Sequence, residues 1–578
     1  MTGRARRTLG GLAGAAALIA VVTVLSRVLG FGRWLVQSGT VGYGSIGTAY
    51  ASANTVPNVL FEVAAGGALA GALIPVIAGP LARGVRGDVD RIASAMLGWA
   101  LVVLVPVAVL LALVADPLAG LLTGRGAGSV ERHLVADFLL VFAVQVPLYG
   151  VGVVLVGVLQ AHRRFLWPAL APLLSSVVVI AAYVAFGALA DGEIDDPSRV
   201  PAAALAWLAW GTTAGVAAMS LPLLLPLRRT GVRLRPTLRF PPGVAVRTRS
   251  LAFAGVGALL AQQAAVVTVL WLANRSGGTG TYLVFQYTQA VYVLPYAVLA
   301  VPLATSTFPR LASRAATGDL DGYASMAAVT TRAVLVVAAV GAAALAAAAP
   351  AVGELFRAIG RGDPDLALAM GPALTWMAPG VLGFALLFHL SRALYALERG
   401  RPAVLATAAG WLLAVVASVV LCSVVVRATP DGPATLTALG AANTLGMTLA
   451  GVALLVAVRR AAGARALHGV PRTLLVLAVA GAVAAVAGRW LTDALAGATG
   501  SGVAAALGSG AAGAVLAAVL VAVAVVALDR GAVRDLRHAD RGEGGSEAAG
   551  EGGGGAARPA GVPAAGTGPA EPGEGFGA

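Results

Sequence analysis

Charged side chains inside long apolar stretches are the residues of this sequence best suited to chemistry. Arg27 and Arg33 bracket the end of the first apolar stretch, and the carboxylate of Glu62 follows in the second. Asp137 and Arg332 are placed in the same way, but each lies near enough to the end of its stretch to be interpreted as a residue of the membrane surface. Because a charge inside a membrane is costly, such residues are candidate functional residues by default.

Arg27 and Arg33 suit a diphosphate, since a guanidinium stays charged and its planar fork donates two parallel hydrogen bonds. On an unbroken helix, six residues turn through about 600°, so these two side chains would point about 120° apart. Gly30 and Gly32 could break the helix and turn Arg33 toward the cavity that Arg27 faces. The alternative is that both arginines reach outward to the polar edge of the bilayer.

Glu62 has two interpretations. In the first interpretation, Glu62 pairs with Arg27 or Arg33 and helps to position their side chains. Alternatively, it holds a proton or a cation, as the coupling residue of a secondary antiporter would. The sequence leaves both open.

A polar surface is predicted in the seventh and eighth apolar stretches. Gln262, Gln263 and Asn274 belong to the seventh. The eighth repeats polar and aromatic residues near helical spacing, namely Tyr282, Gln286, Tyr287, Gln289, Tyr292 and Tyr296. In lipid such a surface needs partners or water, so these side chains are expected to line a wet cavity that accommodates sugars. The alternative is hydrogen bonding between helices, with the tyrosines anchored at the membrane interface.

The composition places this chain in a membrane. Hydrophobic residues make up 58% of the 578 residues and charged residues 11%, whereas a soluble protein carries about 25% charged residues. The formal net charge is +14, and all 40 basic residues are arginines. They stand in short gaps between apolar runs, which favours the positive-inside rule of membrane topology and argues against nucleic-acid binding.

The motifs of several enzyme classes are missing from the sequence. There is no nucleotide-binding loop, catalytic triad or paired-carboxylate arrangement, which indicates a transporter and disfavours an ATP-driven pump or a glycosyltransferase. The single cysteine, Cys422, cannot form an internal disulfide or a metal cluster, and the five histidines show no ligand spacing. We therefore expect no metal and no cofactor, with an Na⁺ or H⁺ gradient or the membrane potential as the driving force.

Fourteen segments are long and apolar enough to cross a bilayer, at about 20 residues per span. The second is too long for one straight helix, and Pro57 and the Gly66-Gly67 pair are expected to bend or break it. The predicted fold is an all-α polytopic membrane protein with about fourteen transmembrane helices. The segments are 9–30, 45–79, 92–122, 133–159, 166–189, 201–227, 249–273, 281–308, 323–350, 366–390, 403–426, 434–458, 473–492 and 502–528.

The arginines test this topology. With the N-terminus in the cytoplasm, 28 arginines fall in cytoplasmic segments and eight in external loops. The acidic loop 191–196 also falls outside. One missed helix would reverse every later loop, so the asymmetry supports an even number of spans and two cytoplasmic ends. We expect a multi-pass protein of a bacterial cytoplasmic (inner) membrane.

Two short matches indicate an internal repeat. Residues 73–78 resemble residues 307–312 at an offset of 234, and residues 159–164 resemble residues 394–399 at an offset of 235. Parallel repeats are typical of transporters that bind substrate between two halves. The predicted domains are two pseudo-symmetric six-helix halves, 1–235 and 236–460, then two extra helices in 461–530 and a disordered cytoplasmic tail in 531–578.

The stretch from Ser26 to Ala78 resembles the MurJ/MviN family of lipid II flippases, within the MOP (multidrug/oligosaccharidyl-lipid/polysaccharide) exporter superfamily. The fourteen-helix layout with two extra C-terminal helices is also similar to that family. The matching pieces are Ser26-Arg27-Val28-Leu29-Gly30-Phe31-Gly32-Arg33, Pro57-Asn58-Val59-Leu60, Gly67-Ala68 and Ile74-Pro75.

This resemblance implies a flippase that moves undecaprenyl-diphosphate-linked peptidoglycan precursor from the cytoplasmic to the outer leaflet by alternating access. It implies a cationic central cavity for the diphosphate and a groove for the lipid tail at the two extra helices. Arg27 and Arg33 match two cavity arginines of the family, and Asn58 belongs to its Pro-Asn motif. The implied partners are the lipid-linked glycan and the bilayer.

The sequence also departs from the family pattern. Phe61-Glu62 stands where the family usually has a basic pair, and Gly66 where it has an acid. An acid expected near Thr48 is absent, and the arginine of helix eight is replaced near Ala290. The predicted cavity is therefore less cationic than the family pattern, which keeps a second substrate open: another polyprenyl-linked glycan.

The leading hypothesis is a lipid II flippase with Arg27, Arg33, Asn58, Glu62, Gln262, Gln286 and Gln289 as substrate-binding residues. The first alternative is a cation-coupled multidrug antiporter of the same superfamily, with Glu62 as the coupling residue. The second is a membrane scaffold that recruits cell-wall synthesis or division proteins through the basic loop 228–249 or the tail.

Overall fold

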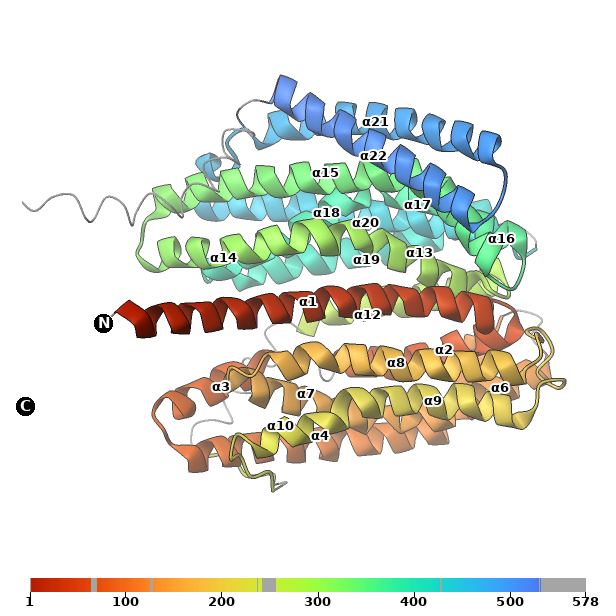
Figure 1. The fold of residues 1–578 in the computed structure, drawn as a ribbon, viewed down its shortest axis with the longest axis horizontal. Coiled ribbons are helices and arrows are strands. Elements are labelled where there is room, and N and C mark those ends of the chain that lie inside the picture. Colours follow the sequence, from red (N-terminus) through yellow and green to blue (C-terminus); the bar gives the residue numbers. More distant parts are fainter. Residues whose placement is uncertain are drawn as a thin grey trace, which may run out of the picture.

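Helices that run side by side in two groups make up the structure, a computed structural model that describes residues 2–63, 70–124, 128–235, 237–241, 256–426, 429–529 and 531. Figure 1 shows α2–α10 in one group and α13–α22 in the other, with α1 and α12 between them. The described residues contain no β-strand. Helices satisfy their backbone hydrogen bonds internally, as apolar segments in lipid require. The all-α fold predicted from the sequence is confirmed.

The helices of the first half are α1 (Thr2–Thr40), α2 (Ser45–Phe61), α3 (Ala70–Ala82), α4 (Arg86–Leu113), α5 (Ala115–Leu122), α6 (Ser129–Ala143), α7 (Gln145–Ala161), α8 (Leu166–Leu189), α9 (Ala202–Ser220) and α10 (Leu224–Arg228). Those of the second half are α12 (Val256–Leu272), α13 (Thr281–Pro295), α14 (Val301–Ala316), α15 (Leu320–Ile359), α16 (Pro364–Leu368), α17 (Met370–Met377), α18 (Gly380–Ala396), α19 (Gly400–Val425) and α20 (Gly432–Ala462). The last two are α21 (Val470–Thr499) and α22 (Val503–Leu528).

Eleven helical stretches of the described residues are long and apolar enough to cross a bilayer. A twelfth results if Pro364–Met377 and Gly380–Ala396, which meet at a bend of 57°, form one span. The predicted spans 9–30 and 45–79 are not among them, so the count of fourteen stays a prediction. Helix α1 covers the first of these, and the second falls on α2 and α3. Pro57 lies inside continuous α2, whereas Gly66 and Gly67 are outside the described residues.

The two halves repeat the same turns in the backbone. Gly84 after α3 and Gly318 after α14 are 234 residues apart and adopt φ angles of 72° and 74°. Arg163 after α7 and Glu398 after α18 are 235 residues apart, and both have a φ of 58°, which is uncommon for residues other than glycine. These turns fall at the offsets that the sequence matches predict. The pseudo-symmetry therefore extends to local geometry, while the exact domain boundaries stay a prediction.

A buried ion pair ties the last two helices to the second half. The guanidinium of Arg332 in α15 lies 2.7 Å from the carboxylate of Asp529, just after α22. The hydroxyl of Thr473 in α21 donates to the other oxygen of this carboxylate and accepts from Arg332. The two charged side chains are only 11% and 4% exposed. The sequence analysis placed Arg332 near the membrane surface, whereas the structure shows that its charge is balanced by packing partners from α21 and α22.

Hydrogen bonds join the two halves at one end of the molecule. We call this set of hydrogen bonds the seam. The backbone N–H of Tyr43 donates to the carbonyl of Arg361 at 2.8 Å, and the N–H of Arg361 donates to the carbonyl of Ser38 at 3.0 Å. Deeper in, the N–H of Gly280 donates to the hydroxyl of Thr48 at 2.7 Å. Gly280 has a φ of 83°, and a Cβ there would strike the Tyr43 carbonyl, so glycine allows this close approach.

Candidate functional site

Two adjoining cavities lie between the halves, on the inner side of the seam. The larger, about 810 Å³, is lined by residues 23–34 of α1 and by parts of α8, α9 and α13, and we call it the arginine vestibule. The smaller, about 300 Å³, is lined by α2, α12, α13, α19 and α20, and we call it the amide pocket. Gln286 and Gln289 line both cavities, so the two are continuous along α13.

Arg27 and Arg33 both line the arginine vestibule, although α1 is an unbroken helix from Thr2 to Thr40. The predicted break at Gly30 and Gly32 is therefore wrong. No break is needed, because α1 packs against α8 and also contacts α13, and the vestibule is lined by all three helices. Side chains about 120° apart on α1 can then reach one cavity.

The two arginines have few partners within the protein. Arg33 lies over the ring of Trp34, with its guanidinium carbon 5.4 Å from the ring centroid, and its Nε is buried without a hydrogen-bond partner. No ion pair to Arg27 or Arg33 is found among the described residues, which include Glu62. The predicted pairing of Glu62 with these arginines is therefore wrong. Their positive charge stays available to an anionic group in the vestibule.

Helix α2 presents Asn58 and Glu62, one turn apart, to the amide pocket. Asn58 is held firmly, because its Nδ2 donates to the carbonyl of Asn54 at 2.8 Å and its Oδ1 accepts from the hydroxyl of Tyr149 at 2.9 Å. Glu62 begins a short π-helical turn at the end of α2, and its side chain is exposed to the pocket. A π turn often marks a functional position in a helix.

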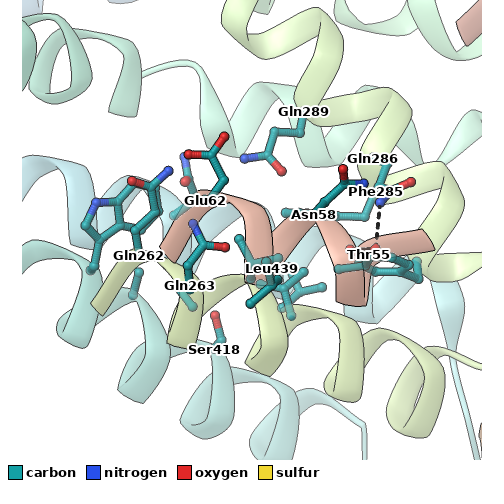
Figure 2. Close-up of a pocket in the computed structure, with 18 residues that line it drawn as sticks. Thr55, Asn58, Glu62, Gln262, Gln263, Phe285, Gln286, Gln289, Ser418 and Leu439 are labelled. Atoms are coloured by element: carbon teal, nitrogen blue, oxygen red, sulfur yellow. Dashed lines mark hydrogen bonds between the residues drawn. The ribbon is translucent and has the colours of Figure 1, made fainter. Parts of the chain in front are cut away.

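The remaining predicted residues come from the second half. Gln262 and Gln263 of α12 and Gln286 and Gln289 of α13 line the amide pocket, and Figure 2 shows them gathered around the same space as Glu62 and Asn58. The Nε2 of Gln286 donates to the hydroxyl of Thr55 at 3.3 Å. The structure thus brings all seven predicted site residues to the two cavities, without testing what each one binds.

Several polar residues of the predicted spans do not line the cavities. Asn274 is buried next to the seam, where its Nδ2 donates to Ser52 and to the carbonyl of Leu122. The ring of Tyr287 packs against Trp34 and Phe356, and it lines neither cavity. For Asn274 and Tyr287, the predicted alternative of contacts between helices therefore agrees better with the structure than the prediction that they line a wet cavity. Asp137 is exposed on α6, away from both cavities.

The sequence analysis missed the far wall of the amide pocket. Trp411 and Ser418 of α19 and Asn443 of α20 line it. Asn443 is a polar residue inside an apolar run, a signal that could have found it, but nothing in the spacing links it to α2. The pocket thus combines amide groups, a carboxylate and an indole ring, which are the groups that bind neutral, hydroxyl-rich molecules such as sugars.

Groups outside the membrane segments stabilise the turns beside the seam. The carboxylate of Glu193 accepts hydrogen bonds from the backbone N–H groups of Asp195, Asp196 and Ile194, and these bonds hold the pKa of Glu193 below its ordinary value. The carbonyl of Ile194 accepts in turn from the N–H of Ile46 at the start of α2. Burial raises the pKa of Tyr43, in the turn before α2, to about 12, so its hydroxyl stays neutral at physiological pH.

Comparison with known proteins gives a consistent result. The sequence profile of the family described as "Lipid II flippase MurJ" matches residues 38–507. A probable lipid II flippase MurJ of Synechocystis sp. is 30% identical over 248 residues, which is 42% of this chain and 45% of the relative. The lipid II flippase MurJ of Burkholderia cenocepacia is 26% identical over 388 residues, 65% of this chain and 71% of the relative. The chain thus spans less than half the length of the first of these relatives.

Solved structures show the same fold. A structure described as lipid II flippase MurJ in an inward closed conformation superposes with a TM-score of 0.69 at 16% identity, over 89% of this chain and 99% of the other. An inward-facing multidrug resistance MATE family transporter of the MOP superfamily superposes with a TM-score of 0.61 at 16% identity, over 77% of this chain and 98% of the other. At these identities the match concerns the arrangement of helices and not the substrate.

Proposed function

This chain belongs to the lipid II flippase MurJ family, and from that premise we propose that it translocates lipid II, the undecaprenyl-diphosphate-linked peptidoglycan precursor, from the cytoplasmic to the outer leaflet of a bacterial cytoplasmic membrane. The observation that carries the proposal is a pair of arginines that lines a cavity between the two halves and has no carboxylate partner among the described residues. Guanidinium groups bind phosphate oxygens through charge-assisted hydrogen bonds. In this proposal Arg27 and Arg33 hold the diphosphate.

The amide pocket has a complementary role in the proposal. A lipid-linked precursor carries sugars next to its diphosphate, and the pocket adjoins the vestibule through Gln286 and Gln289. Amide side chains both donate and accept hydrogen bonds, as hydroxyl-rich headgroups require. We therefore assign the sugars to the residues of this pocket, including Asn58, Gln262 and Glu62.

Alternating access fits the asymmetry between the ends of the interface. The seam blocks the cavities at the end of α1 where Thr40 lies, which the positive-inside assignment places outside the cell. Substrate would then enter from the cytoplasmic side, and release outside would require the seam to break. Both termini are cytoplasmic in this arrangement, and the driving force is an Na⁺ or H⁺ gradient or the membrane potential, without a bound cofactor.

Complementation is the decisive experiment. A bacterium depleted of its own flippase should grow when it expresses this chain, and growth should fail with Arg27→Ala although the protein still inserts into the membrane. Flipping of labelled lipid II in proteoliposomes should show the same difference. If the wild-type chain inserts normally but neither supports growth nor flips lipid II, lipid II is not its substrate.

Glu62 favours a second candidate function. Its carboxylate is exposed to the amide pocket and has no ion pair among the described residues, as a coupling site for H⁺ or Na⁺ in an antiporter would require. The MATE fold of the neighbouring family is compatible with it. Drug efflux that is lost in Glu62→Gln would support this antiporter. Flipping of a different polyprenyl-linked glycan, without flipping of lipid II, would support the other alternative substrate.

A scaffold function rests on segments that the structure describes only in part. Residue 236 and residues 242–249 of the basic loop, and residues 532–578 of the tail, lie outside the described residues. The described part of the loop is fixed to the protein itself, because the N–H groups of Arg233 and Thr237 donate to Asp90 and to the Ser94 carbonyl of α4. Binding of cell-wall synthesis or division proteins there stays a prediction, and complementation by a chain without the tail would argue against it.

A further inference from the structure

Arg392 is a cation of the second half that lies just outside the predicted span 366–390. It lies near the end of α18 and is half-buried. Its guanidinium carbon stands 3.8 Å from the ring centroid of Phe388, and its Nη1 donates to the hydroxyl of Thr305 in α14 at 3.0 Å. The side chain is therefore fixed against the helices and is not a mobile loop charge.

The described residues contain no carboxylate that neutralises the charge of Arg392. Among the described residues it forms no ion pair, in contrast with Arg332, whose carboxylate partner is 2.7 Å away. Its neighbours are a neutral hydroxyl and an aromatic ring, which leaves most of the five N–H donors of the guanidinium without a partner in the described structure. An unpaired charge in a spanning segment is expected to meet an anion or water.

Tyr296 connects Arg392 to the arginine vestibule. It lies between Leu294 and Ala297, which line the vestibule, and its ring packs edge-on against Phe388 at 5.6 Å. Arg27 lines this vestibule from α1 of the first half, whereas Arg392 belongs to α18 of the second half. The two arginines therefore lie on opposite sides of the interface between the halves.

We propose that Arg392 is a phosphate-binding residue of the second half, which contacts the diphosphate of a polyprenyl-linked substrate together with Arg27 at the cytoplasmic side of the vestibule. The proposal rests on the proposed flippase function and adds to it a contact from the other half. A diphosphate carries enough oxygen atoms to accept hydrogen bonds from two guanidinium groups at once. The bound anion would then link the two halves at the end opposite the seam.

Binding measurements on the purified full-length protein test this contact. The dissociation constants of undecaprenyl diphosphate and of uncharged undecaprenol are compared for the wild type, Arg392→Ala and Arg392→Lys. We expect Arg392→Ala to weaken diphosphate binding about tenfold or more and to leave undecaprenol binding within twofold, because only the charge-assisted contact is lost. Arg392→Lys, which keeps the charge without the fork, should recover part of the affinity.

Two control variants separate this role from a structural one. Arg401→Ala removes an exposed arginine at the start of α19 and should leave both affinities unchanged. Thr305→Val removes the hydrogen bond that holds Arg392 but keeps its charge, so the diphosphate preference should persist. Equal losses for both lipids in Arg392→Ala would indicate a structural residue and overturn the proposal, as would wild-type diphosphate affinity. Flipping of lipid II by the wild type is measured in a separate assay. Absence of flipping there would contradict the proposed function, whereas the binding data alone decide whether Arg392 contacts the diphosphate.

Discussion

The two ends of the interface between the halves are built in opposite ways. At the seam, donors and acceptors from both halves meet directly, as the bond from Tyr43 to Arg361 and the bond from Gly280 to Thr48 show. At the arginine vestibule, Arg27 and Arg33 line a cavity of about 810 Å³, and no described carboxylate pairs with them. The contrast teaches that the same pair of helix bundles can close on itself at one end while its charges stay unpaired among the described residues at the other.

Removal of the vestibule charge tests this contrast most severely. We expect Arg27→Ala to lower lipid II flipping in proteoliposomes by at least about 100-fold, since two charge-assisted hydrogen bonds to phosphate are worth roughly 1.5–3 kcal/mol each. Membrane insertion and thermal stability should change little, because no partner is left unpaired. A variant Arg27→Ala that flips lipid II at the wild-type rate would remove the vestibule from the mechanism.

Disruption of the seam should have the next largest effect. Gly280→Val places a side chain at a φ of 83° and against the Tyr43 carbonyl, so we expect a loss of about 1–2 kcal/mol in the stability of this closed arrangement. A cysteine introduced at Ser52 in a Cys422→Ser background should then react faster with a membrane-impermeant thiol reagent. Gly481→Ala is the matched control, because a Cβ at Gly481 meets no atom within 4 Å. Equal reactivity in the two variants would mean that the seam does not control access.

The amide pocket offers a way to sharpen the division between charge and sugar recognition. Asn443→Leu should weaken binding of lipid II about fivefold, since one hydrogen bond is worth roughly 1 kcal/mol, and should leave undecaprenyl diphosphate binding unchanged. Trp411→Ala should act in the same direction. If either variant weakens both lipids equally, the pocket and the vestibule do not divide the headgroup in this way.

A fall in pH should destabilise the turn at Glu193 next to the seam. We expect this to be the smallest of the four predicted effects. The pKa of Glu193 is lowered in the folded protein, so its contribution to stability is present above its ordinary value of 4.5 and is lost as the pH falls through the lowered pKa. The melting temperature of the wild type should therefore fall toward that of Glu193→Gln as the pH is lowered below about 4.5. A constant difference over this range would show that the turn does not depend on the charge.

The all-α membrane fold and the position of the arginines at a cavity could be predicted from the sequence because both follow from local rules, whereas the fourteen spans and the orientation of the termini stay predictions. Apolar length indicates spanning helices, and a charge such as Arg27 near a predicted span has few structural explanations. The glutamines of α12 and α13 could be identified for the same reason. Each of these residues carries its signal in its own segment, so no knowledge of the packing was needed.

Long-range pairs could not be predicted in this way. Arg332 and Asp529 are 197 residues apart, and nothing in either segment indicates the other. Arg392 lies outside the predicted span 366–390 but inside α18, because the end of an apolar run does not show where a helix ends. The predicted break in α1 was wrong because the vestibule is lined by helices on both sides of α1, a property of the assembled bundle and not of Gly30.

The composition of the seam has a consequence for how such a protein can change its cargo. The bonds that join Tyr43, Arg361 and Ser38 use main-chain atoms, which nearly any amino acid supplies. The part of the seam at Tyr43, Arg361 and Ser38 therefore tolerates changes of side chain, whereas Gly280, Thr48 and each cavity residue depend on the amino acid that stands there. Under the proposed function, evolution could replace the residues that contact the headgroup one at a time. The protein could then bind a different lipid-linked sugar while the backbone hydrogen bonds of the seam stay unchanged.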